Sequence, residues 1–102
     1  MTSNSIESAK EFVSNLGYKV INNSVFYGNV PDWKNEIVSF DKKCIYLYKV
    51  SIDENYKPYF STSPNRIFFL DEFEEKFNNT IKFYKNCLSI YKLHQLNKDF
   101  NT

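Results

Sequence analysis

The stretch of residues 71–97, DEFEEKFNNTIKFYKNCLSIYKLHQLN, decides the fold. Its large apolar side chains recur every three or four residues, which is the spacing of one face of an α-helix. Asp71 is placed to cap this helix and Glu74 to complete a capping box, and no Gly or Pro follows. We therefore predict a helix over residues 72–97 with one buried face: Phe73, Phe77, Ile81, Tyr84, Leu88 and Tyr91.

The same helix carries more apolar surface than one sheet usually covers. Phe83 and Ile90 form a second row about 90° from the first, and Leu93 and Leu96 turn further toward the polar side. A helix of this length spans about 39 Å, whereas a compact chain of this size is about 33 Å across. The last turns of this helix should therefore extend beyond the rest of the domain. Either the helix breaks near His94 and folds back, or this row contacts another chain, in a homodimer or with a different protein.

The first element is also predicted to be a helix. Asn4 is a candidate cap with Glu7 three residues later, and Gly17 supplies the left-handed residue that ends many helices. Its apolar face is predicted to hold these residues: Ile6, Ala9, Phe12 or Val13, and Leu16.

Between the helices, short apolar runs alternate with turn residues, a pattern typical of β-hairpins. Asn22 and Asn23 tolerate positive φ and mark the first turn, and Thr62, Pro64 and Asn65 mark a later loop. The predicted strands are residues 18–21, 25–27, 36–40, 44–52, 56–61 and 66–69.

This order of elements predicts one α+β domain over residues 1–102. We expect an antiparallel sheet of about four to six strands, built from hairpins and flanked by the two helices in a two-layer sandwich. Residues 1–4 and 99–102 are expected to be frayed.

Composition argues against an enzyme. The chain has 13 basic and 12 acidic residues and only two glycines, so neither a P-loop nor a dinucleotide fingerprint can be formed. The single histidine, His94, lies about 10 Å along a helix from Cys87, too far for a nucleophile–base pair. We expect no catalytic residues, no metal and no cofactor, and a small enzyme is the third hypothesis in order.

The sequence carries no apolar run long enough for a membrane helix and no export signal. We therefore expect a cytoplasmic protein without a membrane role, in a bacterium or an infected host cell. Cys44 and Cys87 are expected to be reduced thiols.

The loop of residues 28–33 is a second candidate surface. Tyr27 and Trp33 bracket this loop, Pro31 stiffens it, and Trp and Tyr are the residues most often found as binding hot spots. The alternative is that Trp33 plugs the edge of the core. Glu72 and Glu75, next to aromatic residues, are further candidates for partner binding.

The leading hypothesis is a non-enzymatic protein-binding module that masks a surface of a larger protein, such as a nucleic-acid-processing complex. Toxin-immunity proteins and phage-encoded inhibitors of host defence are small, cofactor-free chains of this kind. The alternative is a nucleic-acid-associated accessory protein with an aromatic and basic sheet face. We expect no direct nucleic-acid binding, since acidic residues lie close by in sequence. The residues of that face are Tyr46, Tyr48, Lys42, Lys43, Lys49 and Lys57.

Overall fold

A computed structural model describes the backbone of residues 1–100 and the side chains of residues 1–98. The predicted fraying of residues 99–102 lies largely outside this range. Over residues 1–100 the chain forms two helices, five strands and two short 3-10 turns. In order they are α1 (Ser3–Asn15), β1 (Val20–Ile21), β2 (Ser24–Phe26), η1 (Tyr27–Asn29), η2 (Trp33–Asn35), β3 (Glu36–Phe40), β4 (Ile45–Ile52), β5 (Pro58–Ile67) and α2 (Leu70–Phe100).

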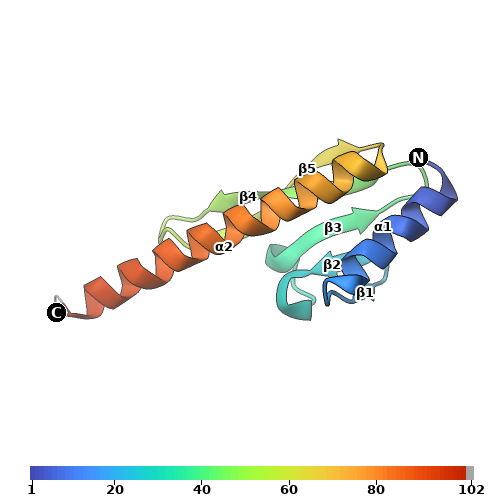
Figure 1. Cartoon of the computed structure of the whole chain (residues 1–102). Helices are drawn as coiled ribbons and strands as arrows, with labels where there is room; N and C mark the ends of the chain where they lie inside the picture. The colour runs from blue at the N-terminus through green and yellow to red at the C-terminus, as the bar shows by residue number, and fades with distance from the viewer. Residues whose placement is uncertain (101–102) are drawn as a thin grey trace.

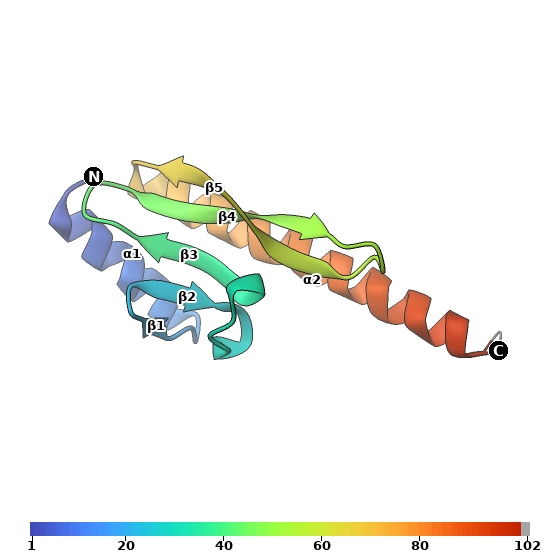
Figure 2. The same cartoon turned by 180° about the vertical axis from the view of Figure 1, so that it is seen from behind.

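The five strands form one antiparallel sheet in the order β1-β2-β3-β4-β5. Both helices pack on the same face of this sheet, which leaves the other face open (Figures 1 and 2). The predicted α+β two-layer architecture is confirmed, and the strand number falls within the predicted range.

The core fills the space between the sheet and the two helices. On α2, the predicted buried face is confirmed for Phe73, Phe77, Ile81 and Tyr84. Phe12 of α1 meets Phe73 and Phe77 edge-on, with ring centroids 6.1 and 6.0 Å apart, so aromatic rings join the two helices. The sheet contributes these buried side chains: Val25, Ile37, Val38, Phe40, Ile45, Leu47, Phe60 and Ile67.

Both helices begin earlier than predicted. Thr2, not Asn4, caps α1, because its hydroxyl accepts a hydrogen bond of 3.1 Å from the Ser5 amide. The amide of Phe73 bonds the carbonyl of Phe69 at 3.0 Å, so α2 begins before Asp71 and the predicted Asp71 cap is wrong. Asp71 lies instead in the first turn, where a carboxylate interacts favourably with the helix dipole.

The end of α1 follows the prediction in part. Gly17 adopts the left-handed conformation expected after a helix, with φ +96°. Leu16 was expected on the core face but is 50 % exposed. The reason is its place after the last turn of α1, where the backbone no longer follows the helix.

The first hairpin turns at two asparagines. Asn22 and Asn23 have φ of 50° and 63°, and Ile21 pairs with Ser24 directly across the turn. Two consecutive positive φ values are what a two-residue hairpin turn requires. The predicted hairpin is confirmed, with Ser24 in the strand rather than in the turn.

The loop predicted at residues 62–65 is wrong, since β5 runs through it. The pairing of β4 with β5 passes from Tyr48↔Pro64 to Val50↔Phe60, so three residues of β5 face one residue of β4. The amide of Ser63 bonds the hydroxyl of Ser61 at 3.3 Å inside this bulge. The turn-forming residues therefore bend and twist the strand without ending it, as Figure 2 shows.

The long helix α2 makes the molecule elongated. Its 31 residues span about 46 Å, and the molecule measures 55 × 23 × 22 Å. The helix is continuous past His94, so a break at that position is wrong. Figure 1 shows its last turns extending beyond the β4–β5 hairpin, which confirms the predicted overhang.

Candidate functional site

Among the exposed aromatic and apolar side chains, two separate groups contain residues that the sequence predicts to bind a partner. The first is a row on α2, made of Phe83, Ile90, Leu93 and Leu96 and called the α2 row below. The second surrounds Trp33 and is called the Trp33 pocket.

The side chains of the α2 row are exposed, and Phe83 also lines a shallow pocket with Tyr48 and Val50 of β4. The exposed fractions of its side chains are 53 % for Phe83, 66 % for Ile90, 60 % for Leu93 and 51 % for Leu96. Phe83 and Ile90 are seven residues apart, two helical turns, and so share one line along the helix. Buried residues such as Tyr84 hold another side of α2 against the sheet, and each side chain of the α2 row is more than half exposed.

The surroundings of the α2 row are basic. Between Lys76 and Lys98 the sequence holds no Asp or Glu. Lys82, Lys85 and Lys92 are exposed along the same helix. The exposed side of α2 therefore combines large apolar side chains with positive charge.

Glu72 and Glu75 do not join the α2 row. Glu72 forms an ion pair of 2.8 Å with Lys76, one turn further along the helix. Glu75 is exposed but precedes Phe83 by eight residues, about 12 Å along the axis. The structure places these two carboxylates at the acidic start of α2, apart from the other predicted residues.

The Trp33 pocket has a volume of about 560 Å³ and lies between η2, the β4–β5 hairpin and α2. Buried Tyr84 and Pro58 form its floor. Its aromatic wall is made by Trp33 and Tyr59, whose ring centroids lie 6.2 Å apart in an edge-to-face arrangement. Its rim is polar and charged: Asp32, Lys34, Asn35, Asp53 and Lys57.

Two aspartates hold the turns that carry the pocket walls. Asp32 caps η2 by accepting a hydrogen bond of 3.2 Å from the Lys34 amide. Asp53 accepts bonds of 2.8 and 2.9 Å from the amides of Asn55 and Lys57 at the end of the hairpin. Each carboxylate satisfies backbone donors of its own turn, so the pocket shape follows from local sequence.

Trp33 does not plug the core, and that alternative is wrong: its side chain is 55 % exposed. The ammonium of Lys34 lies 5.5 Å from the centre of the indole, a cation–π contact. Tyr27 is half-buried, with its ring 4.6 Å from that of Tyr84, and does not line the pocket. Burial, followed by the proximity of Tyr27, raises the pKa of Tyr84 above its usual value, so the phenol stays neutral.

The predicted basic and aromatic sheet face comes together only in part. Tyr46 and Tyr48 alternate onto the same face of β4, and the Arg66 guanidinium lies 5.9 Å from the Tyr46 ring. Desolvation, followed by the nearby Glu36, raises the pKa of Tyr48 above its usual value. Lys57 belongs to the Trp33 pocket instead.

Arg66 was missed because its pairing with Tyr46 depends on β5 being continuous. The exposed pair Phe68 and Phe69, 49 % and 69 % exposed, was also missed. They were read as the end of a strand, whereas β5 ends at Ile67 and both residues lie in the connection to α2.

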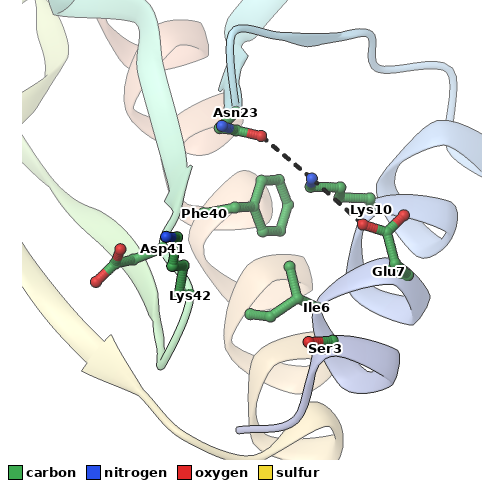
Figure 3. Close-up of a pocket in the computed structure, with 8 residues that line it drawn as sticks. All are labelled: Ser3, Ile6, Glu7, Lys10, Asn23, Phe40, Asp41 and Lys42. Carbon is green, nitrogen blue, oxygen red and sulfur yellow. Dashed lines mark hydrogen bonds and ion pairs between the residues drawn. The ribbon is translucent and has the colours of Figure 1, made fainter.

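A further pocket of about 500 Å³ lies between the start of α1 and the end of β3 (Figure 3). Lys10 crosses it, with its ammonium 3.2 Å from the Asn23 side-chain oxygen and 3.5 Å from Glu7. The same ammonium lies 5.8 Å from the centre of the Phe40 ring. The Lys10 ammonium thus already has partners within the protein and is not left free to bind a ligand.

Both cysteines are free thiols, with Cys44 buried and Cys87 half-buried. No cluster of three or more His, Cys, Asp or Glu side chains suited to a metal occurs in the described part of the chain. Within the same residues, no helix has the length and apolar character needed to cross a membrane.

Comparison of the chain with protein-family models, curated proteins and solved structures found no match.

Proposed function

We propose that this protein is a non-enzymatic binding module that covers a surface of a larger protein, as inhibitors and immunity proteins do. Phage-encoded anti-defence proteins act in this way and form part of the same class. The observation that carries the proposal is the α2 row, four large apolar side chains that are each more than half exposed on a protruding helix.

The spacing of the α2 row suits recognition of a helix by a groove. Phe83, Ile90 and Leu93 follow one another at seven and three residues, the spacing by which helices anchor in apolar grooves. Contiguous exposed apolar surface on a soluble domain commonly marks an interaction site. A partner can reach this side of α2, since the four side chains of the row are each more than half exposed.

The positive charge around the α2 row indicates which kind of partner groove would fit it. The lysines between Lys76 and Lys98 have no acidic neighbours in the sequence of that segment. A partner groove with acidic residues along its rim would complement them and speed association. Apolar anchors are of little use against a phosphate backbone, so a protein groove fits this face better than nucleic acid does.

The test is a quantitative affinity capture from the native host with three baits: the wild-type chain, Ile90→Asp and Leu16→Asp. Leu16, the residue after α1, is 50 % exposed and serves as a matched control for a charge placed on apolar surface. We expect a partner that the wild type and Leu16→Asp retain and that Ile90→Asp loses. The purified partner should then bind Ile90→Asp at least about tenfold more weakly, since hot-spot residues contribute about 2 kcal/mol or more.

Two outcomes would overturn the proposal. One is the same set of captured proteins for Ile90→Asp and the wild type. The other is a wild-type chain whose α2 row is covered by a second copy, seen by sedimentation as a stable dimer that Ile90→Asp dissociates.

The second candidate function is nucleic-acid association through the open face of the sheet. Arg66 stacked beside Tyr46 favours it, because aromatic and guanidinium planes stack on bases. Binding of the wild type and Arg66→Gln to a single-stranded oligonucleotide, titrated with salt, is the test. Absence of binding at low salt removes this candidate.

A further inference from the structure

The Trp33 pocket is separate from the α2 row and lies on other elements. It is the largest concave region described above that combines an exposed aromatic ring with carboxylates. We propose that this pocket binds a guanidinium side chain, an arginine of the partner protein, between the indole of Trp33 and the carboxylates of Asp32 and Asp53. This inference rests on the proposed function, because it assumes a protein partner.

The first support is a cation already placed on the indole. The Lys34 ammonium lies 5.5 Å from the ring centre, within the range of a cation–π contact. Lys34 is exposed, so its side chain can swing away and give its place to a guest. A planar guanidinium is more weakly hydrated than an ammonium and stacks on aromatic rings, which favours arginine as that guest.

The second support is the state of the two carboxylates. Asp32 and Asp53 each use one oxygen, Oδ1, for backbone amides. The ion pairs found within residues 1–98 are Lys10–Glu7 and Lys76–Glu72, so neither pocket carboxylate is paired with a lysine. Their second oxygens remain for the N–H groups of a guanidinium, which bonds carboxylates with favourable geometry.

The third support is the size and floor of the pocket. Its volume of about 560 Å³ is within the range of ligand pockets and exceeds one side chain. Tyr84 and Pro58 close it with buried apolar surface, against which the methylene stem of an arginine packs.

Lys34 on the rim provides a test, because removing its charge should change the affinity in opposite directions for a cationic and an anionic guest. If the guest is a cation, Lys34 competes with it for the indole, and Lys34→Gln should tighten binding about two- to fivefold, the range of an exposed cation–π contact. If the pocket takes an anion, Lys34→Gln should weaken binding, because it removes an attractive charge.

The experiment uses the full chain and the fluorescence of Trp33, the only tryptophan. The probe is N-acetyl-arginine amide, with N-acetyl-citrulline amide as a neutral analogue of the same shape and N-acetyl-glutamate amide as an anion. We expect a saturable fluorescence change with the arginine probe only. It should be tighter in Lys34→Gln and weaker in Asp32→Asn, which keeps an oxygen to cap η2.

Lys42→Gln is the matched control, since Lys42 lines the pocket beside α1 and should leave the titration unchanged. The proposal is overturned if the arginine probe gives no saturable change in either wild type or Lys34→Gln. Equal binding of citrulline, or weaker binding in Lys34→Gln, overturns it as well. If the chain binds the arginine probe while its Ile90→Asp variant retains every partner, only the proposed function is contradicted. The assignment of the pocket then stands.

Discussion

The ring of Tyr56, in the turn between β4 and β5, lies 5.4 Å from the ring of His94 on α2. This contact joins the far end of the hairpin to the helix. Figure 1 shows the last turns of α2 extending beyond the hairpin. Leu96 follows it and is 51 % exposed. The geometry divides α2 into a supported part and a protruding part.

Tyr56→Ala should loosen the protruding turns while leaving the core unchanged. The aromatic pair contributes about 0.5–1.5 kcal/mol, and short helical ends fray without tertiary contacts. Amides of residues 95–98 should exchange hydrogen several-fold faster than in the wild type, whereas the amide of Phe77 should not change. Phe69→Ala, at the opposite end of α2 and 69 % exposed, is the control. Unchanged exchange at residues 95–98 would contradict this prediction.

A second prediction compares two phenylalanines on the same helix. Phe77 is fully buried, with ring centroids 6.0 Å from Phe12 and 5.4 Å from Tyr18, whereas Phe83 is 53 % exposed. Phe77→Ala should lower the free energy of unfolding by about 3–5 kcal/mol because it opens a cavity. Phe83→Ala should change it by less than about 1 kcal/mol. Urea denaturation measures both, and equal losses would mean that the buried and exposed faces of α2 are wrongly assigned.

The fold was largely predictable because its helices and hairpins depend on local spacing. The step of three or four residues from Phe73 to Tyr84 places one face of α2 in the core whatever surrounds it. The turn at Asn22 and Asn23 requires only that both residues accept positive φ. The path of β5 could not be read in this way, because turn residues such as Pro64 are compatible with a loop or with a bulge. Pairing with β4 decides between the two.

Several residues of the candidate site could be predicted from the sequence, but their arrangement in space could not. Exposure of Phe83 and Ile90 follows from their angle to the buried face of α2. The Trp33 pocket depends on contacts between segments far apart in sequence, such as Trp33 with Tyr59, which spacing along the chain does not encode. For the same reason the sequence does not single out Asp53, although it lines the pocket.

A third prediction concerns high pH. Burial raises the pKa of Tyr84 and of Tyr18 above the usual value of 10.0. The folded state therefore holds these protons more tightly than the unfolded chain does. The resulting stability is fully present below pH 10 and is lost as the pH rises through the folded-state pKa values. The free energy of unfolding should fall above about pH 10, and less steeply in Tyr84→Phe, which has no proton to lose there. An identical slope in both proteins would contradict this assignment.

The last prediction separates the two thiols. Cys44 is 4 % exposed and lies next to β4, whereas Cys87 is half-buried on α2. Reaction of a thiol with a disulfide reagent requires access to the thiolate, so Cys87 should react first and Cys44 only when the protein opens. Native protein treated with Ellman's reagent should show one fast thiol, which Cys87→Ser removes and Cys44→Ser keeps. Two thiols of equal rate would mean that the end of the sheet near Cys44 opens readily.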